Sequence, residues 1–198
     1  MLRLNRGGPA RDNLVVSPSP RVVAFPGSSA QHSFRQLLKP VAAFLRRNEL
    51  KGSGQRFMLV AASGDQALVN IQKSTTSTSS VIRFAVNVGV VSKWLWEWEY
   101  EDQAAVRRPD AWSAHWHDRL SDPNTGQERW WEVTSTSDPM AIANEVIELL
   151  EQQALPRMLN LLKDEELVKL WRSGSSPGLT AKQASEYLAA LESHLRSG

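Results

Sequence analysis

The sequence contains no cysteine, which excludes disulfides, thiol catalysis and zinc sites built from cysteine ligands. It also contains no apolar run near the ~20 residues that a membrane-spanning helix needs, and residues 1–30 lack the continuous apolar core of a signal peptide. Walker A, G-x-G-x-x-G and G-x-S-x-G motifs are missing too, and with them the usual markers of nucleotide and serine-hydrolase chemistry. We therefore expect a soluble, cytoplasmic protein that does not bind membranes.

Acidic residues are scarce in the first 40 positions. This stretch has six basic side chains against Asp12 alone, a net charge of +5, whereas the other 158 residues carry 17 basic and 20 acidic side chains, a net of −3. A mildly acidic folded part argues against nucleic-acid binding except through the tail. Residues 1–30 hold four prolines and three glycines, which predict a flexible basic tail. The tail is either an arm for an acidic partner or an extension without a role.

The stretch 69–91 organises the fold. Its second half alternates, so that Ile82, Phe84, Val86, Val88 and Val90 share one side of an extended strand. Residues 69–73 alternate in the same way, and the Ser/Thr tract 74–80 between the two runs is short enough for a hairpin loop. The pattern predicts a central antiparallel hairpin with an aliphatic inner side and a polar outer side.

The remaining elements follow from local signals. The apolar spacing from Ser33 predicts an N-terminal helix that contains Pro40. Residues 55–62, 67–73 and 81–91 are predicted strands, and 111–120 with 128–134 a second hairpin. Residues 94–100 fit either a strand with one aromatic side or a short helix capped by Ser92. Further helices follow Asp138, and Pro156 is expected to interrupt them.

These elements together predict an α+β fold: an antiparallel sheet of about five strands, with the N-terminal helix and the C-terminal helices packed on one face. The predicted organisation is a flexible basic tail over 1–30, a single α+β domain over 31–172, and a linker with a C-terminal helix over 173–198 that packs on the domain. Thr180 and Gln183 fit a capping box for that last helix.

Five short motifs occur in a familiar order. They are Gln-Lys-Ser (72–74), Phe-x-Val-Asn-x-Gly-Val (84–90), His-Trp-x-x-Arg (115–119), Trp-Trp-Glu (130–132) and Leu-Pro (155–156). In this order, between about Phe34 and Trp171, the chain resembles the bacterial family catalogued as domain of unknown function 4304. The resemblance implies the α+β fold and supplies no mechanism and no cofactor.

The most specific hypothesis for an enzyme is a metal site. His115 and His117 lie two residues apart on a predicted strand, so their imidazoles can converge on one ion. Asp118 points to the opposite side, and no third ligand is evident nearby. The alternative is a hydrogen-bonded structural pair. We predict no metal and no cofactor.

The polar outer side of the sheet is the predicted working face. Its candidate binding residues are Asn70, Gln72, Arg83, Asn87, His115, His117 and Arg119. Amides and guanidinium groups offer donors and acceptors in fixed geometry without reacting, which suits recognition. The small residues Ala85 and Gly89 leave room for a ligand to approach. The alternative is a solvated face with cross-strand polar pairs.

The sequence therefore predicts a non-catalytic, adaptor-like or immunity-like module that binds a protein partner on this face. The rival hypothesis is an enzyme acting on a small polar substrate in the same concavity. The depth of the site distinguishes the two, since a closed pocket favours catalysis and a broad, shallow face favours partner binding.

Overall fold

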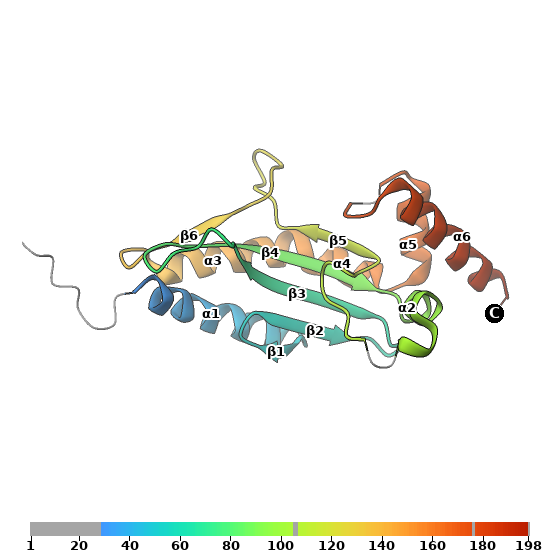
Figure 1. Cartoon of the computed structure of the whole chain (residues 1–198), viewed down its shortest axis with the longest axis horizontal. Helices are drawn as coiled ribbons and strands as arrows, with labels where there is room; N and C mark the ends of the chain where they lie inside the picture. Colours follow the sequence, from blue (N-terminus) through green and yellow to red (C-terminus); the bar gives the residue numbers. More distant parts are fainter. Residues whose placement is uncertain (1–28, 105–106, 176, 198) are drawn as a thin grey trace, which may run out of the picture.

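The computed structural model describes residues 29–104, 107–175 and 177–197, so most of the predicted tail, residues 1–28, lies outside the described part. The fold is α+β, as predicted (Figure 1). The elements in chain order are α1 (Ala30–Arg47), β1 (Lys51–Ser53), β2 (Arg56–Val60), β3 (Gln66–Lys73), β4 (Ile82–Val91), α2 (Lys93–Tyr100), the 3₁₀ turn η1 (Glu101–Gln103), β5 (Trp116–Arg119), β6 (Trp131–Val133), α3 (Pro139–Leu149), the π-helical turn η2 (Leu150–Ala154), α4 (Leu155–Leu161), α5 (Asp164–Arg172) and α6 (Ala181–Ser197).

The sheet is built around β4, the longest strand. Its order is β1-β2-β3-β4-β5, all neighbours are antiparallel, and β6 pairs with β4 as well. β3 and β4 form the predicted central hairpin, with Asn70 opposite Asn87 and Gln72 opposite Ala85. The predicted core side of β4 is confirmed, because Phe84, Val86 and Val90 are each fully buried. The opposite side is buried as well from Ala85 onward, so burial itself does not alternate along the strand.

The predicted second hairpin is wrong. β5 pairs with residues 87–90 of β4, and β6 pairs with residues 82–84 of the same strand. Both are antiparallel to β4 on the edge that β3 leaves free, so they run parallel to each other and cannot be hairpin partners. They lie end to end along β4, and the connection between them is closed by the isolated bridge of Ser121 with Glu128 and by backbone hydrogen bonds from Arg129 to Leu120 and from Asp122 to Gln127. Residues 111–115 form turns that lead into β5.

The hydrophobic core lies between one face of the sheet and the helices α1, α3 and α4, which cover it (Figure 1). Phe84 of β4 is at its centre. The Phe84 ring makes an edge-to-face contact with Phe34 of α1 and stacks on Trp131 of β6, both with ring centroids 5.3 Å apart. Such aromatic contacts add to the energy of burial and fix how α1 crosses the sheet.

The segment after β4 is the short helix α2 and not a strand, so of the two structures that the sequence allowed for residues 94–100 the helix is correct. The hydroxyl of Ser92 accepts a hydrogen bond from the backbone N–H of Leu95, as an N-cap does. The helix buries Trp96 and leaves Trp98 47% exposed, while Trp94 stacks on His194 of α6 with ring centroids 4.3 Å apart. The aromatic run therefore wraps around a helix and does not line one side of a strand.

The C-terminal helices cover one face and one end of the sheet. Pro156, which was expected to interrupt the helix, follows a single π-helical turn that joins α3 to α4. α6 packs on α5 and α2 through the buried Tyr187 and Leu191, and Thr180 with Gln183 forms the predicted capping box. Among the helices of the described residues, none combines the length and the apolar character needed to cross a membrane.

Candidate functional site

The outer face of the sheet, opposite α1 and α3, carries a transverse polar row. Strand register places Arg56 of β2 opposite Asn70, Asn70 opposite Asn87, and Asn87 opposite Arg119. Residues paired in register point to the same side of a sheet. The fold thus brings together three of the predicted residues, on three strands, and adds Arg56 to them. Arg56 escaped the sequence analysis because an exposed arginine on a short strand gives no distinctive signal.

The middle of this row is a closed hydrogen-bond network. Asn87 is only 2% exposed; its amide nitrogen donates to Oε1 of Gln72 at 2.8 Å, and its amide oxygen accepts from Nε of Arg119 at 2.9 Å. Arg119 also pairs with Glu128. Because the buried Asn87 and the partly exposed Gln72 and Arg119 satisfy one another, the network holds β3, β4 and β5 in register and has little capacity left for a ligand.

Two tryptophans extend the network into a stack of cations and aromatic rings. The Arg119 guanidinium lies 5.3 Å from the ring centroid of Trp112 and 4.8 Å from that of Trp130. Arg83 also lies 5.3 Å from the ring centroid of Trp130, and His117 meets Trp112 edge to face at 5.7 Å. Cation–π contacts of this kind stabilise folded segments. Three predicted binding residues are therefore linked to one another through tryptophans that the sequence analysis did not assign to this face.

The room predicted beside Gly89 is filled by the chain itself. A Cβ atom placed on Gly89 would lie 2.7 Å from Cβ of Ala114 and 3.3 Å from Cα of Ala111. The turn that supplies these alanines is held by Asp110, whose carboxylate accepts hydrogen bonds from the backbone N–H groups of residues 112 and 113. The prediction of a ligand groove over Ala85 and Gly89 is thus wrong. The small residue admits the 110–114 turn.

His115 does not lie on the outer face with His117 and Arg119. It precedes β5 and is fully buried, where Nδ1 accepts a hydrogen bond from the backbone N–H of Ser92 at 3.1 Å. Nε2 lies 3.6 Å from Oε2 of Glu99, and this interaction is the main cause that holds the pKa of Glu99 below its ordinary value. The ring also meets Tyr187 of α6 edge to face at 5.1 Å, so His115 joins α2, β5 and α6.

The two histidines therefore contact different parts of the molecule. His117 faces Trp112, and its Nδ1 lies 3.3 Å from the carbonyl oxygen of Ala114. Over residues 29–104, 107–175 and 177–197, no three His, Cys, Asp or Glu side chains gather in a way that could hold a metal ion.

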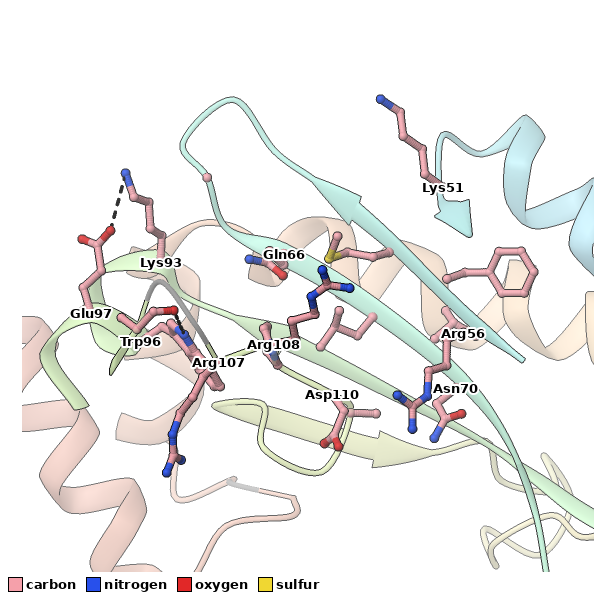
Figure 2. A pocket seen from close by; sticks show the side chains of 18 of the residues that line it. Lys51, Arg56, Gln66, Asn70, Lys93, Trp96, Glu97, Arg107, Arg108 and Asp110 are labelled. Carbon is pink, nitrogen blue, oxygen red and sulfur yellow. Dashed lines mark hydrogen bonds and ion pairs between the residues drawn. The ribbon is translucent and has the colours of Figure 1, made fainter. Parts of the chain in front are cut away.

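The part of the outer face that stays open is a groove of about 960 Å³. β2 and β3 form its floor, and α2 and the segment that follows it form its wall (Figure 2). Arg56 and Asn70 lie together at one end, Lys93 and Glu97 at the other, with Gln66 and Arg108 between them (Figure 2). Of the seven predicted binding residues, only Asn70 lines this groove.

Charged side chains of both signs line the groove, and the basic ones are in a slight majority. The basic residues along it are Lys51, Arg56, Lys93, Arg107 and Arg108, and the acidic ones are Glu97, Glu101, Asp102 and Asp110. Lys93 pairs with Glu97 at 3.8 Å, the carboxylate of Asp110 is engaged by its own turn, and the guanidinium of Arg107 lies 4.5 Å from the ring centroid of Tyr100. Within the described residues, Arg56 and Arg108 form no ion pair.

Apolar side chains complete the floor. Met58 of β2 is 38% exposed, and Leu68 lies opposite it in the strand register. The indole N–H of Trp96 donates to the backbone carbonyl of Ala104 at 3.2 Å, which holds the segment after α2 against that helix within the wall. An exposed thioether beside unpaired guanidinium groups offers a flexible apolar contact together with directional donors.

The family comparison agrees with the motifs. A family model described as a domain of unknown function (DUF4304) matches residues 41–159, more than half of the 198-residue chain. The chain belongs to the DUF4304 family. The DUF4304 match contains every residue that lines the groove and the whole sheet, whereas α5 and α6 lie outside it. Neither the search of curated proteins nor the search of solved structures found a match.

Proposed function

We propose that this DUF4304 protein is a non-catalytic module that binds a partner protein in the groove over β2 and β3. The observation that carries the proposal is the pair Arg56 and Arg108, two guanidinium groups that lie over an apolar floor without an ion-pair partner in the described residues. Arginines placed in this way present several donors in a rigid fork and are common anchors at protein interfaces.

The volume of the groove, about 960 Å³, still lies within the range of small-molecule sites, so its exposure and not its size supports a macromolecular ligand. The side chains along it also belong to separate elements and are largely exposed, as Lys51, Arg56, Met58 and Arg108 illustrate. A small substrate needs a closed site that surrounds it, whereas a protein segment lies along an open groove.

Affinity capture with charge-reversal variants tests the proposal. Full-length protein, the pair Arg56→Glu and Arg108→Glu, and a control pair Arg35→Glu and Arg47→Glu are immobilised and exposed to nuclease-treated native lysate. The control arginines are exposed on α1, on the opposite side of the sheet, and form no ion pair among the described residues. Circular dichroism first establishes that all three proteins are folded.

We expect specific proteins to be retained by the wild type and by the α1 control and to be lost from the groove variant. Mass spectrometry of the eluates measures this difference. Equal retention by all three proteins would place the binding surface outside the groove and would contradict the proposal.

A further inference from the structure

We propose that the ligand of the groove is an extended, acidic protein segment, whose carboxylates pair with Arg56 and Arg108 while an apolar side chain between them packs on Met58. This inference rests on the proposed function and adds the chemical class of the partner. Unpaired arginines, exposed apolar floor and the length of the groove each support it.

The strand register sets the length of the ligand. Three successive rows of the outer face line the floor: Arg56 with Asn70, Met58 with Leu68, and Gln66. Four residues along β3 separate the first row from the last, which is about 13 Å of extended chain. A segment lying along β3 therefore covers the floor with about five residues in extended conformation.

The charged side chains of the groove indicate a negatively charged ligand. Two of its four carboxylates are already occupied, Glu97 by Lys93 and Asp110 by the backbone of its turn. The guanidinium groups of Arg56 and Arg108 are not, within the described residues, and they lie at the end and the middle of the groove (Figure 2). A carboxylate accepts two parallel hydrogen bonds from a guanidinium group, so acidic side chains complement these positions.

A protein segment fits better than a nucleic acid. Single-stranded nucleic acids bind where aromatic rings are free to stack on bases beside a continuous cationic track. Trp96, the aromatic ring of the wall, is only 7% exposed, and its indole N–H is held by the carbonyl of Ala104.

Fluorescence anisotropy with defined probes tests the inference on the full-length protein. The probes are fluorescein-labelled deca-glutamate, the same peptide with leucine at its fifth position, deca-glutamine, and a ten-nucleotide oligothymidine. We expect both glutamate peptides to bind, the leucine-containing one more tightly, and deca-glutamine and oligothymidine to bind at least tenfold more weakly. Affinity should fall as salt rises, because the contacts are ionic and partly exposed.

Two variant pairs locate the binding. Replacing Arg56 and Arg108 by glutamine should weaken glutamate-peptide binding by about fivefold for each arginine, the upper end for partly exposed ion pairs. Replacing Arg35 and Arg47 by glutamine on α1 should change nothing. Because residues 1–40 are also basic, a third variant carries glutamine at Arg3, Arg6, Arg11 and Arg21.

The outcomes separate this inference from the proposed function. Binding that survives in the groove variant and is lost in the tail variant would place the acidic site on residues 1–30 and overturn the inference. Equal affinity for deca-glutamine, unaffected by salt, would overturn the acidic class while leaving a peptide groove. Tighter binding of oligothymidine than of either glutamate peptide would overturn both the acidic-segment inference and the proposed protein-binding function. Failure of every probe would refute the acidic class, and the lysate capture would then decide the proposed function alone.

Discussion

Substituting alanine for Gly89 tests how the 110–114 turn packs over β4 on the outer face. Gly89 lies inside β4, two residues before its end, and does not have a positive φ, so its backbone accepts an alanine. The new Cβ would lie 2.7 Å from Cβ of Ala114 and 3.3 Å from Cα of Ala111, whereas carbon atoms in contact prefer about 3.5–4.0 Å. Both alanines are buried, at 3% and 1% exposure, so the turn must move away from the sheet.

The expected cost follows from two opposing terms. Overpacking a buried site by one methyl group costs about 1–3 kcal/mol. Removing a glycine from the interior of a strand regains about 0.5–1 kcal/mol. We therefore expect Gly89→Ala to lower the free energy of unfolding by about 1–2 kcal/mol, measured by urea denaturation with tryptophan fluorescence. For a chain of this length each kcal/mol corresponds to a decrease of about 2–4 °C in Tm.

A compensating substitution makes the prediction specific. Ala114→Gly removes the atom nearest the new methyl group, so the double variant Gly89→Ala, Ala114→Gly should be more stable than the sum of the single effects by about 1 kcal/mol. Residues that do not touch show additive effects. Additivity, or a Gly89→Ala variant as stable as the wild type, would refute the reasoning that Gly89 is small in order to admit the turn.

Three further predictions concern contacts that hold the fold together. Phe84→Ala should lower the free energy of unfolding by about 3–5 kcal/mol, because Phe84 is fully buried between two aromatic rings, and an unchanged urea midpoint would contradict this. Asn87→Ala should lower the free energy of unfolding by about 1–3 kcal/mol, since Gln72 and Arg119 lose their hydrogen-bond partner. Asn70→Ala should lower it by less than about 0.5 kcal/mol, because Asn70 is partly exposed. Equal costs at both positions would argue against the closed network. The lowered pKa of Glu99 means that its carboxylate stabilises the fold above the ordinary value of 4.5 and loses that contribution as the pH falls through the lowered value. Stability of the wild type should therefore decrease more steeply in acid than that of Glu99→Gln, and parallel pH profiles would contradict the His115–Glu99 interaction.

Local patterns predicted the central hairpin and the helical face of the sheet well. The alternation of Phe84, Val86 and Val88 is a property of one strand, and it states directly which side is buried. The caps at Ser92 and Thr180 depend on contacts within three residues, so they too were readable. The aromatic run 94–100 was ambiguous because three tryptophans at alternate positions suit both periods, and the cap after β4 decided for the helix.

The candidate site was much harder to predict. Its groove depends on contacts between segments far apart in the chain: Arg56 and Arg108 are separated by more than 50 positions, and neither has a local pattern that distinguishes it from an ordinary surface arginine. The predicted residues Gln72, Asn87 and Arg119 do lie on one face, but they bind one another and tryptophans from two loops.

By itself, the sequence determined the two-sided character of β4, the ends of several helices and the family of the chain, because each depends on short-range spacing or on motif order. Only the tertiary structure decided which part of the polar side stays open. The position of the open part depends on where the 110–114 turn packs on the sheet and on the pairing of both β5 and β6 with one edge of β4. Both are long-range packing events, in which the space above Gly89 is filled by alanines more than 20 residues later. No local periodicity encodes such a contact.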